Sequence, residues 1–132
     1  MTTSSTAQSS VEYSPLVMDL FERRPHAGRM ALTLGVHAGR AGEATRGAEV
    51  QFWLKCTLGR IQATSFLAYG CPHTIASASW WAQRVRGLQL GEAEQVGWQE
   101  VEYALSVPAE KRGRLLTVED AMRAALKAAT AG

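Results

Sequence analysis

The strongest constraint on the fold is a run of alternating apolar and polar residues from Val50 to Leu58. An apolar side chain stands at every second position over these nine residues, which is the period of a β-strand with one buried face. The segment Leu58-Gly59-Arg60 predicts a tight turn, and residues 61–69 predict a second strand that runs back beside the first. The sequence therefore predicts an antiparallel hairpin.

Helix signals lie on both sides of this hairpin. Ser14-Pro15 predicts the start of a short helix that ends near Arg24, before Pro25. Further patterns predict a strand over 29–36 and a helix over 74–86 with Gly87 as its C-cap. A second helix is predicted over 92–105, and a third begins at a capping box over 117–120. Strands followed by helices predict an α+β fold, with a small antiparallel sheet of about three strands and helices packed on one face.

The length of 132 residues suits one domain. We expect it to span residues 13–132, because the Ser- and Thr-rich start predicts a disordered tail over 1–12. The net charge of +2 does not favour a nucleic-acid partner, and no apolar run approaches the roughly 18 residues that a membrane partner would need. Two cysteines cannot form a disulfide framework and the N-terminus lacks a leader pattern, so we expect a cytoplasmic protein.

Cys71 is the most informative single residue. It follows the second predicted strand and precedes a predicted helix, where free backbone N–H groups and the helix dipole favour a thiolate. The alternative is an ordinary buried thiol. Cys56 shares the alternating face of Phe52 and Leu54, and we expect it in the core.

Two further features near Cys71 have structural and functional interpretations. His73 stands in a Cys-x-His spacing that would supply half of a metal site, but without a second pair of ligands we expect a solvated histidine at a helix start. Trp80 and Trp81 cannot both face the core, so one of them is edge packing or a partner contact. The chain carries no phosphate loop, dinucleotide fingerprint, HExxH or Gly-x-Ser-x-Gly motif. We therefore expect a protein without catalytic residues, which is not an enzyme.

The most distinctive motif is Phe66-Leu67-Ala68-Tyr69-Gly70-Cys71, followed by Ile75-Ala76-Ser77-Ala78-Ser79 and Gly87. In this motif the chain resembles the IscU/NifU N-terminal type of iron–sulfur cluster assembly scaffold, and the likeness covers Tyr13 to the C-terminus. It implies an IscU/SufE-like fold, a single scaffold domain over 13–132, and protein partners such as a cysteine desulfurase or other assembly factors.

The resemblance also implies a ligand set that this chain lacks. The family holds metal or cluster with three cysteines, assisted by an Asp and a His, and only Cys71 matches a ligand cysteine. Arg46 and Ala48 stand at the first Cys and the Asp, and Gly113 and Arg114 stand at the His and the last Cys. The family's chaperone-docking motif keeps only Pro108 and Lys111. An iron–sulfur cluster or zinc is therefore implied by the resemblance alone, and we expect no cofactor in the isolated monomer.

These replacements predict a change in the chemistry of the site. Clusters and zinc require several anionic thiolates, whereas two guanidiniums repel a cation and stabilise anions. If the fold is kept, we expect Arg46 and Arg114 to point into the same pocket as Cys71 and to lower its pKa.

Three functions fit this pattern. The first is a scaffold-like protein in iron–sulfur cluster assembly that is not an autonomous scaffold, because only Cys71 of the ligands is kept. The second is a non-metal-binding adaptor or regulatory paralogue that binds assembly partners. The third is a persulfide acceptor with Cys71 as its single sulfur carrier.

Overall fold

The predicted hairpin forms two of the three strands of one antiparallel sheet. The computed structural model describes residues 13–132, so the predicted tail over 1–12 lies outside the described residues. Strands β3 (Ala48–Thr57) and β4 (Arg60–Tyr69) pair with Phe52 opposite Phe66. The two-residue turn between them has positive φ at Leu58 and Gly59, which suits the twist of a hairpin.

The remaining strand lies later in the chain than predicted. Residues 29–35 are irregular, and β2 (Val36–Glu43) pairs with β3 to give the order β2-β3-β4. This strand contains Gly39 and Gly42. A Cβ on Gly39 would lie 2.0 Å from the backbone nitrogen of Ala125. Gly39 is therefore a packing residue that lets a helix approach the sheet.

The helices follow the predicted order. They are α1 (Pro15–Arg23), α2 (Pro72–Val85), α3 (Leu90–Ala93), α4 (Trp98–Leu105) and α5 (Arg112–Ala131), with 3₁₀ turns η2 (Ala44–Arg46) and η3 (Ala109–Lys111). The Ser14 hydroxyl accepts a hydrogen bond from the Val17 amide at 3.2 Å, which confirms the predicted cap of α1. The C-cap of α2 is Arg86, with Gly87 following at φ 90°.

Two helix predictions are wrong in their boundaries. The single helix predicted over 92–105 is two helices, because Gly97 is extended and caps α4. The capping box predicted at 117–120 is absent, since the Thr117 hydroxyl donates to the Gly113 carbonyl inside α5, five residues after that helix begins. Both errors arise where a polar or glycine residue fits a helix interior as well as a terminus.

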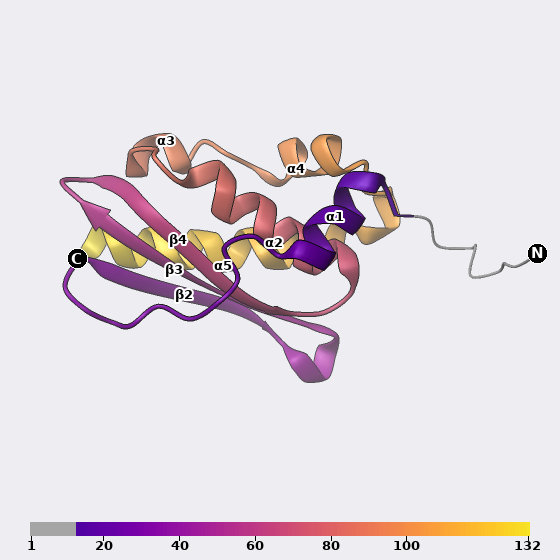
Figure 1. Cartoon of the computed structure of the whole chain (residues 1–132), viewed down its shortest axis with the longest axis horizontal. Helices are drawn as coiled ribbons and strands as arrows, with labels where there is room; N and C mark the ends of the chain where they lie inside the picture. Colours follow the sequence, from indigo (N-terminus) through magenta and orange to yellow (C-terminus); the bar gives the residue numbers. More distant parts are fainter. Residues whose placement is uncertain (1–12) are drawn as a thin grey trace, which may run out of the picture.

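Helices α2 and α5 supply the apolar layer that covers the sheet. Helix α5 packs along β2 and β3, and α2 packs against β4 and α1, as Figure 1 shows. Trp81 is fully buried in this layer, whereas Trp80 is partly buried and meets it edge to face at 5.8 Å between ring centroids. The tryptophan pair is therefore divided as predicted, with Trp80 packed at the edge of the core.

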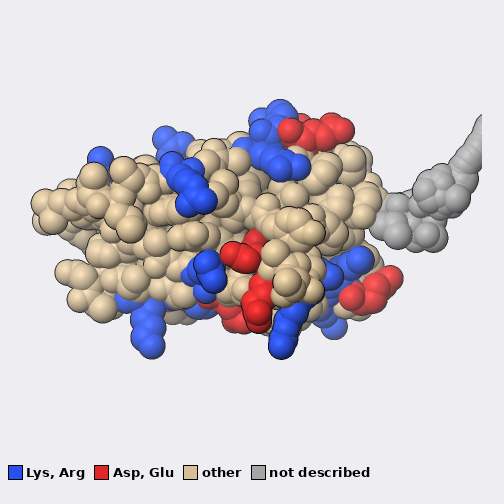
Figure 2. Space-filling model, turned by 90° about the horizontal axis from the view of Figure 1, so that it is seen from below, with Lys and Arg blue, Asp and Glu red and all other residues tan. Residues whose placement is uncertain are grey.

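Charge on the surface is mixed. On the face seen in Figure 2, basic and acidic side chains are interspersed and form no broad patch of one sign. Within residues 13–132, no helix is both long enough and apolar enough to cross a membrane.

Candidate functional site

Cys71 lies at the junction that the sequence predicts. It is the N-cap of α2, one residue beyond Gly70, and Pro72 occupies the first helical position. Gly70 has φ 153°, and a Cβ there would lie 2.9 Å from the Thr74 side chain. The Gly-Cys-Pro sequence therefore lets β4 turn directly into α2 and places the thiol over the first turn of the helix.

The first turn of α2 holds the Cys71 thiol in its anionic form. Burial raises the pKa of this half-buried thiol, but the His73 side chain, the amide and hydroxyl of Thr74 and the His73 amide favour the thiolate. Together they lower its pKa from 9.0 to about 6. The Thr74 hydroxyl lies 3.6 Å from the sulfur. Cys71 is therefore a thiolate at neutral pH, which confirms the predicted direction of its pKa shift.

His73 is buried, so the prediction of a solvated histidine is wrong. Its side chain is 1% exposed and its ring packs against Tyr13 at 4.8 Å between centroids. Among the described residues, neither ring nitrogen has a hydrogen-bond partner of regular geometry. The imidazole therefore makes no regular hydrogen bond to the neighbouring Cys71 sulfur.

Arg46, Ala48 and Arg114 come together as the family resemblance implies. They line a pocket of about 370 Å³ with Gly42, Glu43 and Thr117. The Arg114 guanidinium lies 2.9 Å from where a Cβ of Gly47 would stand, so a side chain at position 47 would displace it. Arg46 is exposed and pairs with Glu43 at 3.7 Å, which offsets part of the positive charge. Gly113 is exposed at the start of α5 and does not line this pocket.

The arginine pocket and the thiol are separate features. Cys71 does not line the pocket of Arg46 and Arg114, and neither guanidinium is among the groups that shift its pKa. The expectation that these two charges create the thiolate is wrong. Groups at the start of α2 favour the thiolate instead, among them the Thr74 hydroxyl at 3.6 Å from the sulfur.

The donors of a metal site are not assembled here. In the part of the chain that the structure describes, no group of three or more His, Cys, Asp or Glu side chains is placed to hold a metal ion.

Pro108 and Lys111 lie at the two ends of the η3 turn before α5 and are partly buried. Sequence reasoning missed Thr74, although its position three residues after an N-cap is where a helix start places a partner.

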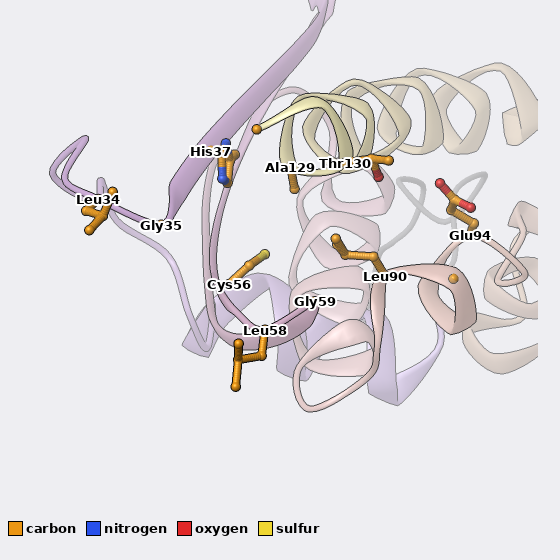
Figure 3. A pocket seen from close by; sticks show the side chains of 12 residues that line it. Leu34, Gly35, His37, Cys56, Leu58, Gly59, Leu90, Glu94, Ala129 and Thr130 are labelled. Carbon is orange, nitrogen blue, oxygen red and sulfur yellow. The ribbon is translucent and has the colours of Figure 1, made fainter.

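Cys56 lies in a different setting from Cys71. It packs against the core on the predicted face, but it also lines a pocket of about 660 Å³ between the β3–β4 turn, α3 and the end of α5. Figure 3 shows its sulfur pointing toward Leu90 and Ala129. Burial raises the pKa of Cys56, so it stays a thiol at neutral pH.

Comparison with known proteins gives a consistent result. A family model described as the NifU-like N terminal domain matches residues 12–131. "Iron sulfur cluster assembly protein 2, mitochondrial" of Saccharomyces cerevisiae is 32% identical over 118 residues, which cover 87% of this chain and 76% of that protein. "Iron-sulfur cluster assembly scaffold protein IscU" of Buchnera aphidicola is 32% identical over 116 residues, with 86% and 91% covered.

A solved structure shares the fold at lower sequence identity. The N-terminal part of a nitrogen-fixing NifU-like protein from Brucella abortus superposes with a TM-score of 0.62 at 15% identity, over 87% of this chain and 90% of that one. At this identity the likeness concerns the fold alone, and it agrees with the three-stranded α+β architecture described above.

Proposed function

The chain belongs to the family of NifU-like N-terminal domains, and on this premise we propose that it is a scaffold-like protein of iron–sulfur cluster assembly that does not hold a cluster on its own. The proposal rests on which residues stand at the positions of the family's ligands, in a chain that keeps the family fold. Cys71, which the resemblance matches to a ligand cysteine, has a pKa lowered to about 6, while Arg46, Ala48 and Arg114, which the resemblance matches to other ligands, line one pocket.

The residues present do not fit a cluster or a structural zinc ion. Such a centre takes four ligands, mostly thiolates whose negative charge offsets that of the metal. Cys71 offers one thiolate, and arginines stand at two other positions where the resemblance implies cysteines, so the negative charge that such a metal needs is missing. We therefore assign the chain a role that it performs with protein partners, by analogy with relatives named as assembly scaffolds.

Binding to a purified cysteine desulfurase tests this role. We expect saturable binding of the intact chain, measured by biolayer interferometry at physiological ionic strength, because the family fold is kept over residues 12–131. A matched chain of similar size and charge from outside the family serves as the control. Binding no tighter than that of the control would contradict a role with this partner.

A second function is favoured by the state of Cys71. A half-buried thiolate with a pKa of about 6 is a competent nucleophile at neutral pH. It can attack the outer sulfur of a cysteine persulfide on a donor protein. The new S–S bond forms as the donor's S–S bond breaks, and the donor cysteine leaves as a thiolate, so no outside oxidant or reductant is needed. Cys71 would then carry a persulfide.

Intact mass measured under non-reducing conditions tests this step. After incubation with the desulfurase and free cysteine, we expect one added sulfur atom in the wild-type chain and in Cys56→Ser, and none in Cys71→Ser. Sulfur on Cys56, or on neither cysteine, would exclude the persulfide carrier. A chain that binds the desulfurase but gains no sulfur would instead be an adaptor.

A further inference from the structure

A second basic pocket lies at the outer edge of the sheet, away from the residues that stand at the family's ligand positions. It has a volume of about 550 Å³ and lies between β4 and the end of α2. The residues that line it are His26, Arg60, Ile61, Gln62, Gln83, Arg86 and Gly87. None of them is acidic, and none lines the pocket of Arg46 and Arg114.

Backbone hydrogen bonds fix the walls of this pocket. Strand β4 is the last strand of the sheet, next to α2 (Figure 1), and its outer edge carries two isolated bridges, Ala27 to Phe66 and Arg60 to Gln89. The Phe66 amide donates to the His26 carbonyl at 3.2 Å, and the Gly87 amide donates to the Ile61 carbonyl at 2.8 Å. Three chain segments are thus tied together around the pocket before any ligand binds.

No carboxylate of residues 13–132 pairs with the arginines of this pocket. Arg60 donates from Nη1 to the Gly87 carbonyl at 2.7 Å, which holds its guanidinium at the rim. Over residues 13–132, six other arginines pair with a carboxylate, and neither Arg60 nor Arg86 does. Two guanidiniums therefore face one pocket whose remaining polar side chains are two amides and an imidazole.

We propose that this pocket binds the phosphoryl dianion of a small phosphorylated molecule. Two uncompensated positive charges are neutralised by a ligand of charge −2, whereas one carboxylate would leave one charge over. Arg60, Arg86 and the two Gln amides offer donors from β4 on one side and α2 on the other. A tetrahedral group with three free oxygens can accept from both sides, and a planar carboxylate is already satisfied by a single guanidinium.

His26 reports on the occupant. Burial lowers its pKa below 6.5, and the positive charge of Arg86 lowers it further. The other groups that line the pocket are the cation Arg60 and the neutral Gln62 and Gln83. A bound dianion reverses the electrostatic part of this shift, so the pKa of His26 rises when the dianion binds, and the dianion itself binds more tightly when His26 is protonated.

NMR titration with inorganic phosphate tests the proposal. We expect saturable shifts confined to residues 26, 60–62 and 83–87, a higher His26 pKa at saturation, and similar behaviour with sulfate. Acetate at equal ionic strength should bind at least about tenfold more weakly, since it brings one charge. Absence of saturable shifts, or equally tight acetate binding, would overturn the phosphoryl site.

A matched pair of variants separates the pocket from net charge. Arg86→Gln should weaken phosphate binding by about tenfold, because it removes a charge-assisted contact. Lys127→Gln removes the same charge from an exposed position on α5 and should leave the affinity within about twofold. Equal losses in the two variants would show a general charge effect and overturn the site. If Arg86→Gln does not fold, phosphate binding is measured in Gln83→Ala instead, together with the pKa of His26 in wild type. Weaker binding in Gln83→Ala and a higher His26 pKa with phosphate would support the site, and the absence of both effects would overturn it.

Discussion

Cys71 owes its chemistry to contacts within a single helical turn. The Thr74 hydroxyl lies 3.6 Å from its sulfur, and groups of His73 and Thr74 favour the thiolate, so its pKa falls to about 6 despite partial burial. The sequence predicts the position and the direction of this shift, because a strand followed by Gly-Cys-Pro marks a helix start. It could not predict the cause, since the distance from Cys71 to Arg46 and Arg114 depends on how three separate elements pack.

The first prediction concerns the alkylation of Cys71. Its rate with iodoacetamide should rise with pH around a midpoint near 6, and Cys71 should react faster than Cys56 at pH 7, because burial raises the pKa of Cys56. Thr74→Val should raise the Cys71 midpoint, since the hydroxyl beside the sulfur is lost. Rates are measured by mass spectrometry of peptides from each cysteine.

The arginines supply the control for this prediction. Arg46→Ala with Arg114→Ala should leave the Cys71 midpoint unchanged, because neither guanidinium contributes to its pKa. A midpoint raised by the double arginine variant and unaffected by Thr74→Val would contradict the contacts described here.

The second prediction concerns stability and pH. The pKa of Cys71 is about 6 in the folded chain against an ordinary value of 9.0 for a free thiol, so thiolate formation stabilises the fold. That contribution is complete above about pH 9 and is lost as the pH falls toward 6. The free energy of unfolding of wild type relative to Cys71→Ala should therefore increase from pH 6 to pH 9 in urea titrations. A difference that is constant over this range would contradict a lowered pKa.

At the scale of elements, the hairpin is predictable and the first strand is not. Alternation from Val50 to Leu58 identifies β3 because its side chains carry the pattern. Strand β2 has small residues at Gly39 and Gly42 because α5 lies against it, so its local sequence reads as a loop. The sequence also does not indicate the break between α3 and α4, because Gly97 is tolerated within a helix and also fits an N-cap.

The third prediction tests the close packing of α5 on β2. Gly39→Ala places a Cβ 2.0 Å from the Ala125 amide nitrogen, and the backbone on either side cannot move without separating the helix from the sheet. We expect a loss of about 2 kcal/mol or more in the free energy of unfolding. Gly91→Ala is the matched control, because a Cβ there meets nothing within 4 Å. Urea titration of both variants compares them, and equal stability would contradict the packing.

At the scale of the whole molecule, the chain keeps the family fold, and we propose that its ligand positions differ from those of the family. The family model matches residues 12–131, and the sheet and helices occupy the predicted layers. The sequence could predict this combination because the fold depends on the spacing of apolar residues, whereas ligation depends on a few separate positions. The pocket of Arg60 and Arg86 could not be predicted, since its lining residues come from distant parts of the sequence, between positions 26 and 87.

The central claim is that the single chain lacks the donors for a cluster, and anaerobic reconstitution with iron and sulfide tests it most directly. The measurement is iron and sulfide per monomer after desalting, with mass analysis to detect sharing between two chains. The comparison is a variant that restores the family ligands, Arg46→Cys with Ala48→Asp, Gly113→His and Arg114→Cys. We predict no stable cluster on the wild-type monomer and a clear gain in bound iron and sulfide in the variant, because the chain would then carry all the ligands that the family resemblance implies. A near-stoichiometric cluster on the wild-type monomer would contradict the account.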